Sequence, residues 1–302
     1  MNISNLLSNA KTGNLDACSE CPWSPKLIEK IGFGVSCREH GYNWKKKGKV
    51  LSMTIVQDPG DTTAQDTGRL CIIHNAENSS DKSAQQSLEL WKAAVSLDNN
   101  SAKTGVYLKY HYWTNSILHG VSKKSFLINK KMNSNFKADI YRRTTILKAR
   151  KNCTNVLKEQ ILTLQPLIII ASGKFAADSL YDIGLIKLKW DNFKYSFSKG
   201  AYKEGIKNWN KINHTITVFC TYHTSRGVVN RTVSKKYVKT ETEKYLKIKR
   251  DKLNKPNSVD IFLKTHDNEI NVTDCGMRYL LNHWLDIGFE IRSRYKEYTK
   301  AI

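Results

Sequence analysis

Short, continuous apolar runs recur along the chain after residue 50, and each is followed by polar residues. Runs of this length that contain β-branched or aromatic side chains are typical of strands buried on both faces of a sheet. Four of them predict strands, over residues 50–56, 106–113, 166–171 and 215–220. The first fifty residues are predicted to be irregular.

Between these runs, apolar positions recur with the spacing of a helix. They predict helices over residues 83–97, 152–164, 237–253 and 284–298, and Gly173 opens another helix after the third strand. Strands that alternate with helices indicate a central, mostly parallel sheet with helices on both faces, which is a three-layer α/β/α sandwich. A basic stretch at about 120–150 interrupts the pattern and is predicted to be an insertion that carries a helix.

The predicted elements define one α/β domain over residues 1–235 and a basic helical extension over residues 236–302. We expect the extension to pack on the same domain. A chain of 302 residues is long enough to bury a large core. We expect it to be a monomer.

The charge of the chain narrows the class of partner. Hydrophobic residues make up 40% and charged residues 25%, as in ordinary globular proteins, but the formal net charge is +22. A charge of this size favours nucleic acid or an anionic membrane surface as a partner. The membrane is the weaker candidate, because no predicted helix combines the basic residues with a strong apolar face. A lysine-rich surface without such a partner is the alternative.

The sequence also indicates the cellular compartment and the use of the cysteines. No stretch approaches the roughly 20 continuous apolar residues that span a bilayer, and the first residues do not resemble a signal peptide. We therefore expect a cytoplasmic protein with reduced thiols. The seven cysteines are odd in number and are not spaced like a disulfide framework, so core filling or metal ligation is their expected use.

Three polar side chains follow the predicted strands: Asp58, Asn115 and His223. In a parallel sheet the carboxyl ends of the strands meet at one edge, where ligands bind, so we expect these side chains to lie close together. A carboxylate can orient a water or stabilise a cation, an amide can read the edge of a base, and an imidazole can stabilise a leaving anion. This set suits a transition state with a cationic sugar and an anionic leaving group. Taken singly, each residue also fits a structural role.

Five segments around these residues resemble the uracil-DNA glycosylase superfamily in the right order. They are Val56-Gln57-Asp58-Pro59-Gly60, Thr67-Gly68-Arg69-Leu70-Cys71, Tyr112 to His119, Cys153 to Ala177, and Thr221-Tyr222-His223-Thr224-Ser225. The first resembles the Gly-Gln-Asp-Pro-Tyr motif of one branch, and the others are closest to the iron–sulfur branch, often called family 4. The resemblance implies the fold of that superfamily. It also implies a DNA glycosylase that flips uracil, or a related damaged base, out of DNA and hydrolyses its N-glycosidic bond in base-excision repair.

The resemblance also assigns roles to single residues. Asp58 would position the attacking water and stabilise the sugar cation, and His223 would stabilise the departing base anion. Asn115 would read the Watson–Crick edge of the flipped base. The remaining positions are Gln57, Gly60 and Cys71 in the base pocket, and Ser225, Arg226 and Asn230 on the DNA. Contacts to DNA phosphates would use the basic excess.

Three positions depart from the family pattern. Cys71 replaces the stacking Phe of the iron–sulfur branch, Gly60 replaces the Tyr that excludes thymine in the other branch, and Thr224 replaces a Pro. The identity of the excised base therefore stays open. The alternative is a glycosylase-like DNA-binding protein without uracil-excision activity, or one that acts on another modified base.

The resemblance further implies a metal centre. Cys18 and Cys21 match the first two cluster ligands of the iron–sulfur branch, Cys153 matches the fourth, and His119 stands in place of the third. Three thiolates and an imidazole could hold a structural 4Fe–4S cluster or a zinc ion, and Cys37 is an alternative ligand. A degenerate site without metal, or a zinc-containing nucleic-acid-binding module without catalysis, is also open. The other cysteines, Cys71, Cys220 and Cys275, are expected to be buried hydrophobes.

Overall fold

The fold is known from a computed structural model. It describes residues 3–24, 31–35, 50–57, 82–96, 106–121, 143–224, 236–253, 257–267 and 272–300. Most of the predicted basic insertion lies outside these residues.

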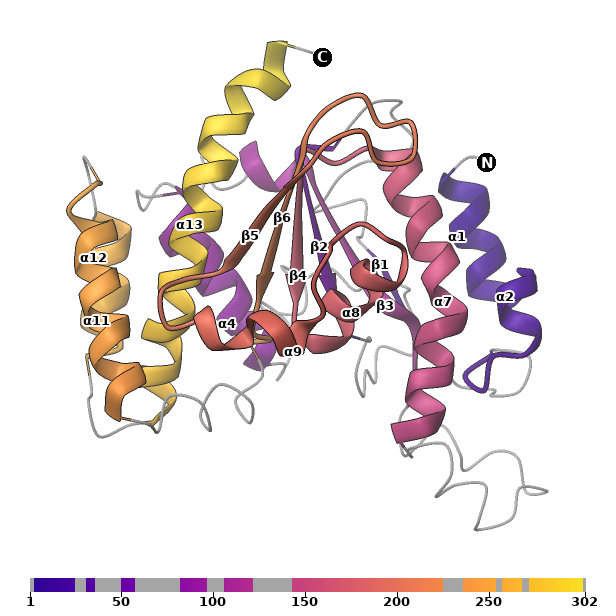
Figure 1. Ribbon diagram of the computed structural model, residues 1–302, viewed down its shortest axis with the longest axis horizontal. Coiled ribbons are helices and arrows are strands. Elements are labelled where there is room, and N and C mark those ends of the chain that lie inside the picture. Colours follow the sequence, from indigo (N-terminus) through magenta and orange to yellow (C-terminus); the bar gives the residue numbers. More distant parts are fainter. Residues whose placement is uncertain are drawn as a thin grey trace.

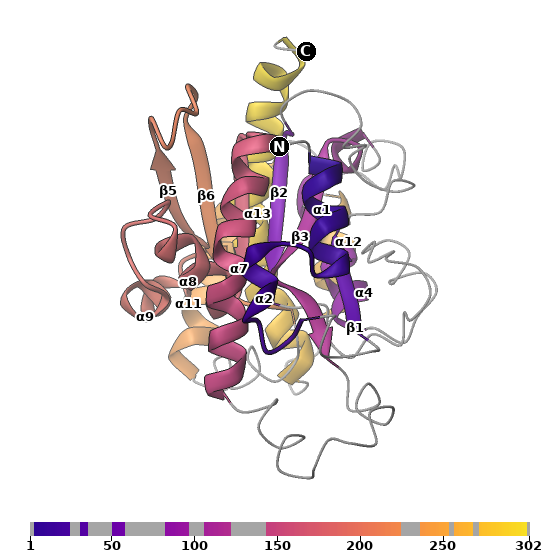
Figure 2. The same ribbon diagram turned by 90° about the vertical axis from the view of Figure 1, so that its right-hand side faces the viewer.

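The described strands form one six-stranded sheet in the order β1-β3-β2-β4-β6-β5. Their bounds are Ile31–Val35 for β1, Ser52–Val56 for β2, His111–Val121 for β3, Ile168–Ser172 for β4, Tyr202–Ile206 for β5 and Ile216–Thr221 for β6. The four central strands are parallel, whereas β1 and β5 pair antiparallel at the two edges. The prediction of a mostly parallel sheet between helical layers is therefore confirmed (Figures 1 and 2).

Burial explains why the central strands could be read from the sequence. Every residue of β4 and of β6 is buried, as expected for strands covered on both faces. Strand β5 alternates between half-buried and exposed positions at the edge of the sheet. Such a short, mixed pattern was not predicted as a strand.

Helices cover both faces of the sheet. On one face lie α7 (Arg143–Leu164) and α8 (Lys174–Asp182), which contact β3 and the neighbouring strands. On the other lie α4 (Lys82–Trp91), its π-helical continuation η1 (Lys92–Ser96) and α13 (Val272–Lys300), which contacts β4 and β6 (Figures 1 and 2). The smaller elements are α9 (Trp190–Phe193), η3 (Lys194–Ser196), α11 (Lys236–Arg250) and α12 (Asn257–Thr265).

The amino-terminal region is not irregular, contrary to the prediction. It contains α1 (Ile3–Thr12), α2 (Asp16–Ser19) and the edge strand β1, and both helices pack against α7. The buried residues of α1 are Ile3, Leu6, Leu7 and Ala10. This i, i+3, i+4, i+7 spacing is typical of an amphipathic helix, so the sequence contains the signal for α1.

The predicted starts of β3 and α7 are wrong. Residues 106–108 are helical, and β3 begins only at His111 and continues to Val121. The predicted helix 152–164 is the second half of α7, which begins at Arg143. In both cases charged or aromatic residues obscured the boundary, because they fit several local structures equally well.

His266 connects three helices through charge. Its Nδ1 lies 2.8 Å from Asp274 Oδ1 on α13, and its Nε2 lies 2.6 Å from Glu89 Oε1 on α4. Both ring nitrogens face carboxylates, so the imidazolium form suits the site. Burial disfavours that charged form, but the hydrogen bonds to Glu89 and Asp274 outweigh it and raise the pKa of His266.

A raised pKa in the folded state predicts pH-dependent stability. The His266 contribution is fully present below the ordinary pKa of 6.5 and is lost as the pH rises through the folded value. The difference in free energy of unfolding between wild type and His266→Gln should therefore be largest below pH 6.5 and shrink as the pH rises above it. Urea denaturation at several pH values measures it. A difference that stays constant, or grows with pH, would contradict this assignment.

Candidate active site

Some of the predicted site residues lie outside the described part of the chain: Asp58, Gly60, Cys71, Ser225, Arg226 and Asn230. Their roles stay predictions. The described ones are Gln57, Asn115 and His223 at the sheet edge, and Cys18, Cys21, His119 and Cys153 in the expected metal site.

Gln57 follows the last residue of β2 and is held by β3. Its backbone carbonyl accepts hydrogen bonds from Ser116 Oγ at 2.7 Å and from the Ile117 amide at 3.0 Å. The side chain of Gln57 is exposed. These two bonds fix the backbone that leads directly into Asp58.

Asn115 lies inside β3 rather than after it, which corrects the prediction. It is paired with Val56, the last residue of β2, and only 5% of it is exposed. The register of β3 against β1 shifts beside it: Val35 pairs with Thr114, but Phe33 pairs with His119. Such bulges re-aim side chains and are frequent next to active sites. Asn115 therefore reaches the carboxyl edge of β2 although its own strand continues.

His223 follows β6 and lies against the start of α8. The Gly173 amide donates to the Thr221 carbonyl at 2.7 Å, which joins the ends of β4 and β6. Gly173 has φ +95°, and a Cβ added there would lie 3.3 Å from the Cβ of His223. Both the left-handed backbone and the close approach require glycine at this position. His223 itself is half-buried.

The residue after His223 is anchored to another helix. Thr224 is buried, and its Oγ1 lies 2.8 Å from Oγ of Ser87 on α4. Thr224 stands where the resembling motif has a Pro, so a side-chain hydrogen bond restrains the loop here. Nothing in the sequence around Ser87 signals this contact.

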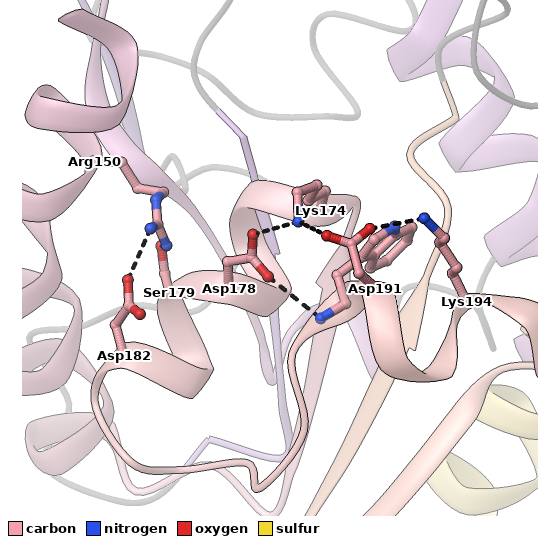
Figure 3. A network of polar contacts seen from close by, with 8 residues as sticks. Arg150, Lys174, Asp178, Ser179, Asp182, Asp191 and Lys194 are labelled. Atoms are coloured by element: carbon pink, nitrogen blue, oxygen red, sulfur yellow. Dashed lines mark hydrogen bonds and ion pairs between the residues drawn. The ribbon is translucent and has the colours of Figure 1, made fainter. Parts of the chain in front are cut away.

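A charged network connects α8 and α9 near the end of β4 (Figure 3). Lys174, the first residue of α8, binds Asp178 at 2.9 Å and Asp191 at 2.7 Å. Asp191 also binds Lys194 at 2.8 Å, and Asp178 accepts from the amide of Trp190. The hydrogen bonds from Lys174 and Lys194 lower the pKa of Asp191 to about 2. The network joins α8 to α9 beside the segment that contacts His223.

Three of the four expected metal ligands gather between α2 and α7. Cys21 and Cys153 belong to one buried cluster with Ile117. Burial raises the pKa of Cys153 to about 12, and the neighbouring thiols of Cys21 and Cys18 add to the effect. These thiols are therefore close enough to interact electrostatically.

His119 is buried near the end of α1. Burial lowers its pKa to about 4, and hydrogen bonds to the backbone of Ala10 and Lys11 partly oppose this. A neutral imidazole is the form that binds metals. However, no group of three or more His, Cys, Asp or Glu side chains in the described part of the chain is placed to hold a single metal ion. The ligand set and the metal it would hold therefore stay predictions.

The carboxyl edge of the sheet thus combines Gln57, Asn115 and His223. Strands β2, β4 and β6 are neighbours, so β2 and β6 lie about 10 Å apart. The model of the family described as the uracil DNA glycosylase superfamily matches residues 52–247, more than half of the chain. The chain belongs to the uracil-DNA glycosylase superfamily. No curated protein matches the chain.

Membership in the uracil-DNA glycosylase superfamily indicates a hydrolase of the DNA-glycosylase type that acts on DNA. The family segment contains all three residues of the sheet edge but neither Cys18 and Cys21 nor α12 and α13. The iron–sulfur branch is therefore not established by the match. Among the helices that the structure describes, none is long and apolar enough to cross a membrane.

Proposed function

We propose that this protein flips uracil, or a related damaged base, out of DNA and hydrolyses its N-glycosidic bond. The observation that carries the proposal is the contact between Gly173 and His223, on the same sheet edge as the Val56–Asn115 pair. His223 thus lies on one side of this end of the sheet, and the buried Asn115 lies on the other. This arrangement is suited to a base whose polar edge and leaving atom are recognised separately.

In the proposed mechanism each residue has one task. Asn115 reads the Watson–Crick edge of the flipped base with its amide. Asp58 orients the attacking water and stabilises the positive charge that develops on the sugar. His223 stabilises the negative charge that develops on the departing base, next to the amino-terminal end of α8, whose dipole favours an anion.

A base other than uracil is the second candidate. Gly60 leaves out the side chain that would exclude a methyl group, and Cys71 cannot stack on a base as an aromatic ring does. Both substitutions favour a pocket that accepts a larger or modified base. The retained Asp58, Asn115 and His223 argue against a DNA-binding protein without catalysis.

Base release from labelled single-stranded and double-stranded oligonucleotides with one deoxyuridine tests the proposal. We expect free uracil and an alkali-sensitive abasic site. If uracil is not released, the same assay with a panel of modified bases decides between the two candidates. Binding of all these oligonucleotides without release of any base would contradict the proposal.

We also propose that Cys18, Cys21 and Cys153, with His119, hold a 4Fe–4S cluster. The support is the gathering of three buried thiols at the positions where the resemblance to the iron–sulfur branch expects ligands. The cluster would fasten the amino-terminal helices to α7 and supply no chemistry to base release. Iron and sulfide analysis of the purified protein should find a cluster that Cys153→Ser loses and Cys275→Ser retains. Equal metal content in the two variants would contradict this ligand set.

A further inference from the structure

Helix α13 lies outside the segment matched by the family, yet it contacts the strand that leads to His223 (Figure 1). His283 on α13 is fully buried. Its Nδ1 lies 2.8 Å from Oγ1 of Thr221, and its Nε2 lies 2.6 Å from the carbonyl oxygen of Phe197. Thr221 is the last residue of β6, two positions before His223.

The partners determine which atoms carry the protons. A carbonyl oxygen can only accept, so the hydrogen of the ring must be on Nε2, which donates to Phe197. In a neutral ring Nδ1 then accepts, and the Thr221 hydroxyl donates to it. Burial lowers the pKa of His283 to about 3, so the ring is neutral at neutral pH. Both ring nitrogens are thus used in bonds of fixed direction.

The turn that contains Phe197, the second hydrogen-bond partner of His283, is itself held in place by other side chains. The carbonyls of Phe197, Ser198 and Lys199 accept hydrogen bonds in turn from His283, Asn282 and Lys249. Lys249 also binds Asp286 on α13 at 2.7 Å. Three consecutive carbonyls of one turn are therefore held by the carboxy-terminal helices, which makes the turn a firm base for His283.

Aromatic packing extends this restraint to the residue beside His223. The ring of Tyr222 packs edge-on against Phe197 and Trp190, with centroids 5.0 and 5.2 Å apart. Tyr279, one turn before His283 on α13, lies 6.0 Å from Tyr222. Helix α13 thus contacts the side chains of both Thr221 and Tyr222, the two residues immediately before the candidate catalytic histidine.

We propose that His283 is a positioning residue that fixes the end of β6 through Thr221 and thereby sets the place of His223. The inference deepens the proposed function and rests on it. It makes α13 a functional part of the enzyme rather than an added helix. A residue that only stabilises the fold would change the folded fraction, whereas a positioning residue changes the rate of the chemical step.

The same strand and helix supply a matched control. Thr217 in β6 is buried like Thr221, and its Oγ1 donates to Glu290 on α13 at 2.8 Å, four residues upstream of the site. Thr221→Val and Thr217→Val therefore remove the same kind of hydrogen bond between the same two elements. Thr221→Ser keeps the hydroxyl and serves as the rescue.

The rate of base release, KM and amide hydrogen exchange are measured for all three variants. We expect Thr221→Val to lower the single-turnover rate about tenfold with KM changed less than about twofold, because small displacements of a catalytic group are costly. Exchange at residues 221–224 should become faster. Thr217→Val should keep the wild-type rate and the exchange of this segment, and Thr221→Ser should recover most of the rate.

Equal rate losses in both valine variants, or an unchanged rate and exchange in Thr221→Val, would overturn the inference. If the wild type releases no base from any oligonucleotide, the proposed function fails. The exchange comparison then still decides whether His283 holds the end of β6.

Discussion

Replacement of His223 by alanine should lower the rate of base release by about a hundredfold or more, because loss of a group that stabilises a developing anion has costs of this size. His223 is half-buried and its Cβ lies close to Gly173, at the end of β6 next to the start of α8. DNA affinity should change little, since phosphate contacts dominate binding. Single-turnover kinetics with a deoxyuridine oligonucleotide measure the rate, and a mobility-shift titration measures the affinity.

His214→Ala is the control for this substitution. His214 is half-buried and bonds through Nε2 to the carbonyl of Pro166, before β4 and β6 begin. His214 therefore lies where the parallel strands begin, whereas His223 lies where they end. We expect the wild-type rate from this variant. A His223→Ala protein that releases base as fast as His214→Ala would remove His223 from the mechanism.

Replacement of Gly288 by alanine should destabilise the protein by about 3 kcal/mol or more. A Cβ at this position of α13 would lie 2.0 Å from the carbonyl oxygen of Ala94 and 2.8 Å from its carbonyl carbon. Both are backbone atoms of η1, so the helix as a whole must move. That movement would also break the bonds from Arg292 to the carbonyls of Ala94 and Val95.

Chemical denaturation compares this variant with Gly205→Ala. In β5, a Cβ at Gly205 meets nothing closer than the methyl group of Thr215 at 3.8 Å. The free energy of unfolding of Gly205→Ala should differ from that of wild type by less than about 1 kcal/mol. Equal denaturation midpoints for the two variants would show that α13 does not pack on η1 in this way.

The central sheet could be predicted because its strands are covered on both faces. The run at residues 166–171 predicts a buried strand, because it is short, begins with a proline and contains three consecutive β-branched isoleucines. Strand β5 could not be predicted in the same way, because two of its five residues are exposed and none is fully buried. The predicted range of β3 is wrong because the strand extends to Val121 through its pairing with β1, which its own composition does not indicate.

The candidate site was predictable only where a local motif marks it. Gln57, Asn115 and His223 stand in segments that resemble family motifs. The structure brings the end of β2, Asn115 inside β3 and the end of β6 to the same side of the sheet. The supports of His223 are different. Ser87 and His283 lie 137 residues before Thr224 and 62 residues after Thr221, and their contacts depend on how α4 and α13 pack. No periodicity or spacing within the sequence encodes such a contact.

The most direct test of the central claim compares the wild-type protein with Asp58→Asn on one deoxyuridine oligonucleotide, with release and binding measured side by side. The change removes the charge but keeps the shape of the side chain. We predict that the wild type releases free uracil, and that Asp58→Asn binds the oligonucleotide with unchanged affinity but loses most of the release. Release by Asp58→Asn at the wild-type rate would contradict the proposed mechanism. Binding without release of uracil by the wild type would contradict the assignment as a uracil-DNA glycosylase.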